Sequence, residues 1–238
     1  MNEINQENRQ RYSRHMMIDG IGEDGQRKLL KSKVFVLGCG ALGSISSMYL
    51  AGAGIGEITI ADFDTVDISN LQRQLTFSIN DLGKPKAEIL AKRMSSLNPD
   101  IKINAINGFI NRDAAQKLIE NSDFVIEGSD NPDTKYMVDE ICSHLGKPYC
   151  LAGVNGMEGQ LITHIPGSAL YSDIFPIPHE ISGYTPCSVG GVLGALPGIM
   201  GSIQAAEAIK YITGTGELFI NRLLTVDLRS CQLHSIDV

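Results

Sequence analysis

Short apolar runs alternate with longer amphipathic stretches over most of the chain. The runs are rich in β-branched and aromatic residues, as in Lys33-Val-Phe-Val-Leu-Gly38, and each has the length of a buried strand. The pattern predicts strands at 33–38, 57–61, 101–106, 123–127 and 148–153, with helices between them at 41–53, 85–97, 113–120 and 131–145. This alternation indicates an α/β, Rossmann-like fold, with a mostly parallel sheet and helices on both faces.

The two ends of the chain follow other patterns. Residues 6–31 are polar with periodic apolar positions, which predicts two short helices. After residue 158 we expect an antiparallel C-terminal extension of the sheet, because strand-like segments follow one another at 159–165, 217–220, 223–228 and 231–236. They are separated by a Pro-rich loop, 166–189, and a predicted helix, 193–213. A loop of this length in a compact domain is usually functional or mobile.

Composition and charge narrow the class of protein. The 238 residues are 43% hydrophobic and 20% charged, as in an ordinary globular domain with a substantial core. The net charge of −7 argues against binding to nucleic acid or to an anionic membrane surface, since both need a positive field. The five cysteines form no C-x-x-C pair and the start of the chain has no signal pattern, which predicts a cytoplasmic protein. No apolar run is long enough to cross a bilayer.

A glycine-rich motif follows the first predicted strand. Gly38-Cys-Gly-Ala-Leu-Gly43 opens a predicted helix, and Asp62 ends the next strand. The glycines allow a tight turn, the start of the helix favours phosphate, and a carboxylate at this distance can bind ribose hydroxyls. The sequence therefore predicts a nucleotide site. The motif alone does not separate NAD from ATP, and glycines that serve only a tight turn remain the alternative.

The residues after Asp62 favour a nucleoside triphosphate. The polar stretch from Asp64 to Gln74 contains the three amides of Asn70, Gln72 and Gln74 and the guanidinium of Arg73, and Lys86 opens the next helix. A dehydrogenase has no need of these groups beside the ribose carboxylate, whereas additional phosphates need bidentate and charge-assisted donors. Asp130, after the fourth strand, lies at the carboxyl edge of the predicted sheet, where it suits Mg²⁺ that bridges phosphates.

Seven segments occur in the order of a known family: Arg11-Tyr-Ser-Arg14, Gly38-Cys-Gly-Ala-Leu-Gly43, Asp62-Phe-Asp64, Ser69-Asn-Leu-Gln-Arg-Gln74, Gly83-Lys-Pro-Lys86, Ser129-Asp-Asn131 and Gly201-Ser-Ile-Gln-Ala-Ala-Glu-Ala-Ile-Lys210. Over nearly the whole chain they resemble the ThiF/MoeB/HesA family, the bacterial relatives of ubiquitin-activating enzymes. The resemblance implies an ATP-dependent adenylyltransferase that works as a homodimer. Its substrate would be the C-terminal carboxylate of a small ubiquitin-like sulfur carrier ending in Gly-Gly, like ThiS or MoaD, and pyrophosphate would be released. The activated carrier would serve sulfur transfer for thiamin, for molybdopterin or for a related product.

The resemblance also implies roles for individual residues. The positions that would contact the nucleotide are Gly38, Gly40, Ala41, Gly43, Asp62, Asp64, Ser69, Asn70, Leu71, Gln72, Arg73, Lys86, Asp130 and Asn131. Within this set Asp62 would hold the ribose, Arg73 and Lys86 the phosphates, and Asp130 the magnesium ion. Arg14 would reach the active site of the other subunit. Cys187 lies where family members often carry a cysteine for thioester or acyl-disulfide chemistry, although a lone loop cysteine is more often incidental.

The chain departs from the family pattern at one structural site. Many members carry two C-x-x-C pairs that bind zinc, but the stretch 170–173 has no cysteine and only Cys231 lies near the end, so no zinc is predicted. We expect one adenylation domain over 1–238. Its three parts would be N-terminal helices 1–32, a nucleotide-binding half 33–153, and a carrier-binding and dimer half 154–238 that contains the loop 166–189.

Three other functions remain open at this stage. A family offshoot would adenylate a small-molecule or peptide carboxylate instead of a carrier protein. An NAD-dependent oxidoreductase is the alternative from another class, but Arg73 and Lys86 argue against it and no acid–base pair for hydride transfer is evident. A nucleotide-binding scaffold without turnover is the third.

Overall fold

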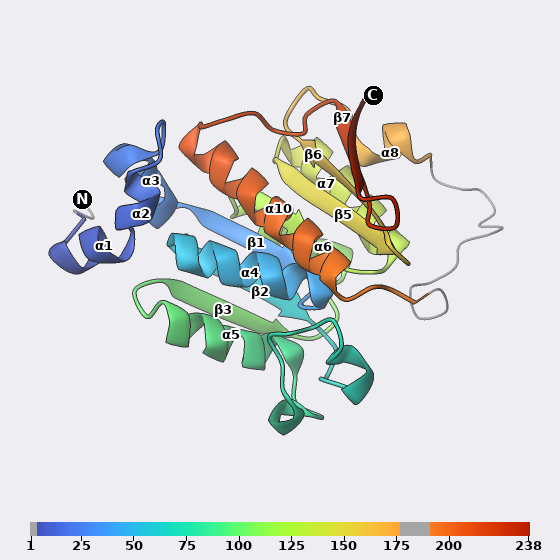
Figure 1. The fold of residues 1–238 in the computed structure, drawn as a ribbon, viewed down its shortest axis with the longest axis horizontal. Coiled ribbons are helices and arrows are strands. Elements are labelled where there is room, and N and C mark those ends of the chain that lie inside the picture. The colour runs from blue at the N-terminus through green and yellow to red at the C-terminus, as the bar shows by residue number, and fades with distance from the viewer. Residues whose placement is uncertain (1–3, 177–190) are drawn as a thin grey trace.

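The computed structural model describes residues 4–176 and 191–238. Its centre is an eight-stranded sheet in the order β3-β2-β1-β4-β5-β6-β7-β8 (Figure 1). The parallel strands are β1 (Lys33–Leu37), β2 (Glu57–Asp62), β3 (Lys102–Asn107), β4 (Phe124–Glu127) and β5 (Tyr149–Asn155). The antiparallel strands are β6 (Glu158–His164), β7 (Arg222–Asp227) and β8 (Gln232–Asp237). The predicted α/β fold, mostly parallel with an antiparallel C-terminal extension, is confirmed.

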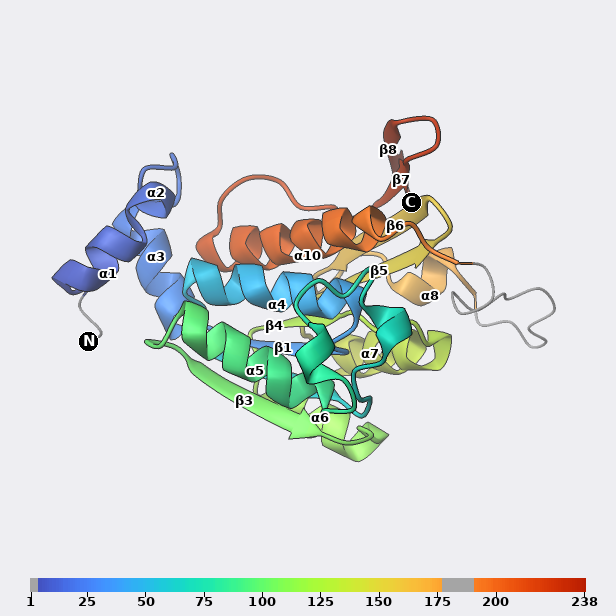
Figure 2. The same cartoon turned by 60° about the horizontal axis from the view of Figure 1, so that its bottom comes forward.

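Helices cover both faces of this sheet. One face carries α4 (Ala41–Ala53), α5 (Lys86–Leu97) and α10 (Ala195–Thr213), and the other carries α6 (Arg112–Glu120) and α7 (Pro132–Leu145) (Figure 2). The smaller helices are α1 (Gln6–Arg11), α2 (Ser13–Met16), α3 (Gly22–Lys31), α8 (Tyr171–Ile174) and the 3₁₀ turns η1 (Ile68–Asn70) and η2 (Ile79–Asp81). In the ranges 4–176 and 191–238, no helix combines the length and the apolar character needed to span a membrane.

The central strand explains why the domain has two cores. In β1, Val34 and Val36 pack with α4, α5 and α10, whereas Phe35 and Leu37 pack with α6 and α7. All four side chains are less than 9% exposed. A parallel strand that is apolar on both faces must be covered on both, so the continuous run at 33–38 in the sequence already implied this layering.

The strand order places a topological switch between β1 and β4. The chain runs from β1 outward through β2 and β3, and then returns to pair β4 with the other edge of β1. In the register of the sheet, Leu37 is the partner of both Ala61 and Glu127. The loops that leave these three strands therefore start side by side at the carboxyl edge, which is where open α/β sheets bind ligands.

Two of the predicted elements were wrong. Residues 6–31 form three helices instead of two, because the backbone leaves the helical conformation at Tyr12 (φ −98°, ψ 12°) as well as at the turn that contains Gly20. Residues 217–220 do not form a strand. The N–H of Phe219 donates to the buried carboxylate of Glu207 at 2.8 Å, so this segment shares only the bond from Thr163 N–H to the Phe219 carbonyl with the sheet.

A buried amide anchors the N-terminal helices to the domain. The side chain of Asn98 donates to the hydroxyl of Tyr12 at 2.8 Å and to the carbonyl of Ala51 at 2.7 Å. Asn98 is 0% exposed and Tyr12 is 2% exposed. Tyr12 joins α1 to α2, so this one amide links the N-terminal segment to the end of α4.

Asn98→Ala should lower the free energy of unfolding by about 1–3 kcal/mol, because it leaves buried acceptors without a donor. Urea denaturation of the full chain measures this. Asn121→Ala is the matched control: that amide is exposed and donates only to the Lys117 carbonyl, so its loss should cost less than about 0.5 kcal/mol. Equal losses in the two variants would show that Asn98 is no anchor.

Candidate active site

The predicted glycine motif forms a tight turn from β1 into α4. Gly38 has φ +94°, in the left-handed region that favours glycine. A Cβ at Gly43 would lie 1.8 Å from the Gly38 carbonyl oxygen, and a Cβ at Gly38 would lie 2.9 Å from the carbonyl carbon of Gly128. No side chain fits at these positions, since the turn packs its backbone against itself and against the residue that follows β4.

The start of α4 is open to a ligand. Gly40 is the N-cap residue of α4 and has no side chain to bind the first N–H groups of the helix. A Cβ at Gly40 would have only the Nε2 of Gln74 near it, at 3.7 Å. Uncapped N–H groups and the positive end of the helix dipole together attract an anion, which fits the phosphate role predicted for Gly38–Gly43 and for Ala41.

Asp62 joins the end of β2 to the glycine turn. Its carboxylate accepts the backbone N–H of Cys39 at 2.6 Å and that of Asp64 at 2.7 Å. Burial raises the pKa of Asp62, and the two hydrogen bonds offset part of that effect. The residue predicted to hold ribose is therefore fixed beside the residues predicted to hold phosphate.

Lys86 is a buried cation at the same edge of the sheet. Its side chain is 6% exposed, and its Nζ lies 2.8 Å from a carboxylate oxygen of Asp64, whose side chain is 49% exposed. The backbone N–H of Lys86 also donates to the Asp64 carbonyl at 3.0 Å. The pairing compensates a charge that would be costly to bury alone, and it positions the ammonium next to Asp62.

The polar stretch after β2 folds into a compact turn. In η1, Asn70 accepts the N–H of Asp67 at 3.2 Å, and the hydroxyl of Ser69 donates to the carboxylate of Asp67 at 2.7 Å. Arg73 donates to the carbonyl of Ser69 at 2.9 Å. Ser69 and Asn70 thus shape the turn that presents Arg73, in addition to any contact with a ligand.

The same stretch lies against the glycine turn. Leu71 packs on the larger core, and Gln72 contacts Gly194 at the start of α10, where a Cβ would lie 2.4 Å from the Gln72 carbonyl oxygen. The buried amide of Gln74 lies at Gly40. Arg73, between these two glutamines, is therefore placed near the opening of α4.

Asp130 and Asn131 begin the loop from β4 into α7. Asp130 is exposed, and the side chain of Asn131 caps α7 by accepting the N–H of Asp133 at 2.9 Å. The backbone nitrogen of Ser129 lies 2.9 Å from the Cβ position of Gly38. Asp130 thus directly follows a residue that contacts the glycine turn.

Comparison with known proteins identifies the family. A model described as the ThiF family matches residues 12–238. The chain belongs to the ThiF family. The resemblance predicted from the seven motifs is confirmed from residue 12 to the end of the chain.

Two relatives of similar length are named for the predicted activity. The chain is 39% identical over 226 residues to the SAMP-activating enzyme E1 of Haloferax volcanii, covering 95% of this chain and 84% of that protein. It is 37% identical over 228 residues to the sulfur carrier protein ThiS adenylyltransferase of Escherichia coli K12, covering 95% and 90%. It also matches the adenylyltransferase and sulfurtransferase MOCS3 of Drosophila grimshawi at 38% identity over 230 residues, covering 96% of this chain but only 51% of that protein.

A solved structure supports the fold. The crystal structure of E. coli MccB with ATP superposes with a TM-score of 0.83 at 27% identity, covering all of this chain and 73% of that one. Its similarity extends to both halves of the sheet, because the whole chain is covered. The Rossmann-like arrangement predicted from the sequence is therefore also that of a solved structure.

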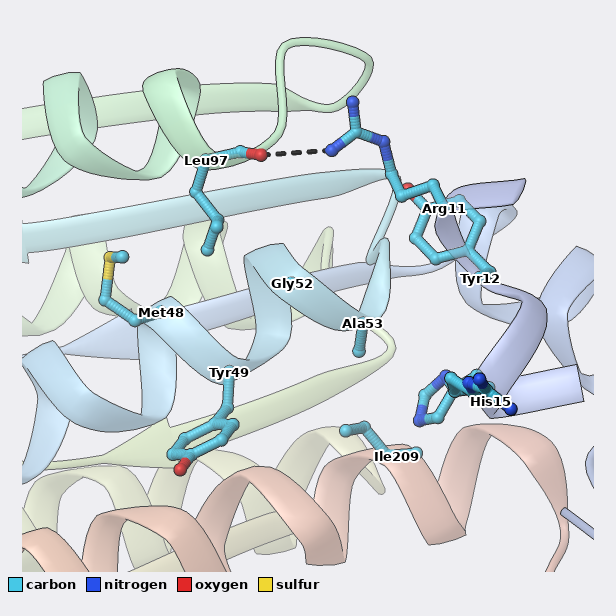
Figure 3. Close-up of a pocket in the computed structure, with 10 residues that line it drawn as sticks. Arg11, Tyr12, His15, Met48, Tyr49, Gly52, Ala53, Leu97 and Ile209 are labelled. Atoms are coloured by element: carbon cyan, nitrogen blue, oxygen red, sulfur yellow. Dashed lines mark hydrogen bonds between the residues drawn. The ribbon is translucent and has the colours of Figure 1, made fainter. Parts of the chain in front are cut away.

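Arg14 is the predicted site residue of this ThiF family member that lies apart from the others. It lines a cavity of about 490 Å³. Tyr49 and Ala53, from the last turns of α4, line the same cavity (Figure 3). The glycine turn opens the other end of α4, whose 13 residues span about 20 Å. Arg14 therefore does not join the site of its own chain.

The predicted cysteine nucleophile, Cys187, lies outside the described residues. Among the cysteines that the structure describes, Cys39, Cys142 and Cys150 are buried, and burial raises the pKa of each thiol. At neutral pH these three are thiols, which are poor nucleophiles. Cys187 stays a prediction.

A buried ion pair that was not predicted from the sequence lies behind the site. Glu127, the last residue of β4, pairs with Lys135 of α7, and both are less than 9% exposed. The available signal was a charged residue at the end of the apolar run Phe124-Val-Ile-Glu127. Such a residue must find a partner when its strand is central in the sheet.

Gly43→Ala should lower the free energy of unfolding by about 3 kcal/mol or more, because the added Cβ would overlap the Gly38 carbonyl and force the backbone apart. Urea denaturation measures this. Gly52→Ala, in the same helix, has only Leu97 near it, at 3.8 Å, and should be neutral or stabilising by about 1 kcal/mol. If Gly43→Ala keeps the wild-type free energy of unfolding, the close approach of the backbone at Gly43 to the Gly38 carbonyl is not required.

Proposed function

We propose that this chain is an ATP-dependent adenylyltransferase that activates the C-terminal carboxylate of a small ubiquitin-like sulfur carrier. One observation carries the proposal: a glycine turn, a ribose-type carboxylate and a buried lysine meet at the switch point of a ThiF-family sheet, with Asp130 on the adjoining loop. Relatives named SAMP-activating enzyme E1 and ThiS adenylyltransferase support a carrier protein as the substrate.

The nucleotide is assigned to the groups at the carboxyl edge. The N-terminus of α4, opened by Gly40, receives a phosphate, and Asp62 accepts hydrogen bonds from the ribose hydroxyls. Arg73 and Lys86 bind the β- and γ-phosphates. The ammonium of Lys86 can exchange its bond to half-exposed Asp64 for a phosphate oxygen without leaving the site.

Asp130 is assigned to magnesium. In the ranges 4–176 and 191–238 no cluster of three metal-ligating side chains occurs, so this part of the chain offers no cage for a metal ion. Mg²⁺ bound to nucleotides is usually held by one or two carboxylates together with phosphates and waters, which a single aspartate on the loop after β4 fits. The ion, when bound, would neutralise the charge of the phosphates.

The reaction that these groups support is transfer of an adenylyl group. A carboxylate oxygen of the carrier's last glycine forms a bond to the α-phosphorus, and the bond from that phosphorus to the bridging oxygen of pyrophosphate breaks. Pyrophosphate leaves with the electron pair, and no proton has to move. Positioning and charge neutralisation therefore carry the reaction, which explains why the site is built from cations and backbone N–H groups.

A homodimer would complete the site. In this proposal each site is completed by Arg14 from a second copy of the chain, because Arg14 lies at the far end of α4 from the site of its own chain. Tyr49 on α4 lines the cavity and is 58% exposed, which gives the second copy an apolar surface to cover. We place the enzyme in the cytoplasm, where the free thiols Cys39 and Cys231 would stay reduced.

A peptide or small-molecule carboxylate is the second candidate substrate. The observation in its favour is the structural similarity to MccB, the microcin C7 biosynthetic enzyme, with a TM-score of 0.83 in its complex with N-formylated MccA. The chemistry would be the same and only the surface that binds the substrate would differ. Activity with carriers that end in Gly-Gly separates the two candidates.

Asp130→Ala should reduce ATP–pyrophosphate exchange by about a hundredfold or more, since it removes a preorganised charge at the phosphates. The assay uses ThiS-like and MoaD-like carriers ending in Gly-Gly, and the same carriers without that ending. Asp133→Ala, an exposed carboxylate in the first turn of α7, is the control and should exchange normally. Normal exchange by Asp130→Ala would remove Asp130 from the site, and no exchange with any carrier would reject the carrier proposal.

Mixing two inactive variants tests the composite site. Arg14→Ala and Asp130→Ala should each be inactive alone, but a mixed dimer contains one site with Asp130 of one subunit and Arg14 of the other. Random reassortment should restore about a quarter of the wild-type exchange, because half of the dimers are mixed and half of their sites are intact. Sedimentation velocity checks that the subunits dissociate and reassociate. If they do and pyrophosphate exchange still does not recover, Arg14 lies outside the partner's site.

A further inference from the structure

A buried ion pair lies directly behind the loop that carries Asp130. Glu127 is 0% exposed, and its Oε2 binds the Nζ of Lys135, which is 7% exposed. Burying two charges gives little net stability unless their remaining hydrogen-bonding capacity is also used. The other partners of this pair therefore indicate its role.

Both members of the pair bind Ser129, the residue before Asp130. The N–H of Ser129 donates to Glu127 Oε1 at 2.8 Å, and its hydroxyl donates to the same oxygen. The carbonyl of Ser129 accepts from Lys135 Nζ at 2.9 Å. The N–H, carbonyl and hydroxyl of one residue are thus held by one ion pair, which leaves the peptide unit before Asp130 little freedom.

The pair is itself held by the sheet and by α10. Lys135 donates to the carbonyl of Ala152 in β5 at 2.8 Å, so its three N–H groups have three acceptors: Glu127, Ser129 and Ala152. Gln204 of α10, which is 0% exposed, donates to the Glu127 carbonyl at 2.7 Å. Elements β4, α7, β5 and α10 therefore meet at these two residues, and the loop after β4 depends on them.

We propose that the Glu127–Lys135 pair is a positioning device that fixes the direction in which Asp130 leaves the sheet. By immobilising Ser129 it holds the carboxylate where magnesium and the phosphates need it, so that no reorganisation is required when they bind. The inference rests on the proposed function for the role of Asp130. The pair also fixes Gly128, whose Cβ position lies 2.9 Å from the Gly43 nitrogen, so the same two charges set the wall of the glycine turn.

The test is the effect of Mg²⁺ on nucleotide affinity. Glu127→Gln keeps the shape of the side chain and an acceptor for Ser129, but removes the charge that holds Lys135. The affinity of the full chain for a non-hydrolysable ATP analogue is measured by isothermal titration with and without MgCl₂. In Glu127→Gln the gain in affinity that Mg²⁺ gives should be at least about tenfold smaller than in wild type. A loss of this size is typical when a residue that hydrogen-bonds a metal ligand is replaced. Asp130→Ala sets the loss expected when the carboxylate is absent.

Glu207→Gln is the matched control. Glu207 is likewise 0% exposed and paired with a lysine, Lys210, and it binds the Thr163 hydroxyl and the Phe219 N–H on another part of the sheet. It should lower the urea midpoint comparably but keep the wild-type Mg²⁺ effect. An equal loss of the Mg²⁺ effect in both variants would reduce the Glu127–Lys135 pair to a general stabilising role and overturn the inference.

A double variant keeps the test decisive if Glu127→Gln does not fold. Glu127→Gln with Lys135→Met removes both charges, so no unpaired charge stays buried, and the folded protein should lose the Mg²⁺ effect to the same extent. A wild-type Mg²⁺ effect in this variant, or in Asp130→Ala, overturns the inference. Because the readout is binding, it is independent of the carrier: wild-type protein that binds the Mg²⁺–nucleotide but exchanges with no carrier would reject the proposed function alone.

Discussion

The contact between the glycine turn and the loop after β4 is the constraint on which the site depends. Leu37 and Glu127 are partners in the sheet, so the residues that follow them must share one space. That space admits backbone only, because a Cβ at Gly38 would lie 2.9 Å from the carbonyl carbon of Gly128. Because no side chain fits in this space, the backbone N–H groups at the start of α4 stay uncovered at the carboxyl edge of the sheet. The same packing that closes the turn thereby creates an anion site.

Two buried lysines lie at the carboxyl edge of the sheet and have different roles there. The carboxylate that pairs with each lysine determines its role. Lys86 is paired with Asp64, whose side chain is 49% exposed, so its bond can be exchanged for a bond to an arriving phosphate. Lys135 is paired with Glu127, which is 0% exposed and which no ligand replaces. Losing that partner would leave a buried charge uncompensated, a far larger penalty than losing a half-solvated one. Lys86 is therefore suited to binding and Lys135 to holding the framework.

The sequence was sufficient for the parallel half of the fold because periodicity and glycine placement are local signals. The helix predicted at 41–53 matches α4 to the residue, and the motif Gly38–Gly43 lies where a Rossmann-like turn must lie. The segment 217–220 was wrongly predicted as a strand because its interaction with Glu207 is not visible in a local pattern. The carboxylate of Glu207 accepts the N–H of Phe219, which a strand would use for the sheet. The Glu127–Lys135 pair was missed although its members are close in the sequence. Its meaning depends on Ser129 and Ala152, which only the folded chain brings together.

The position of Arg14 shows how the fold limits what one chain can do. The glycine turn and the cavity that Arg14 lines lie at opposite ends of α4, and α10 packs along the helix between them. A rigid helix of about 20 Å cannot be shortened to bring the two together. Arg73 can reach the phosphates from within the chain, but Arg14 can reach a site of this kind only in another copy of the chain. Adenylation by this fold would then be linked to assembly, because a subunit that lacks a partner would hold every group of the site except the one at the far end of its own helix.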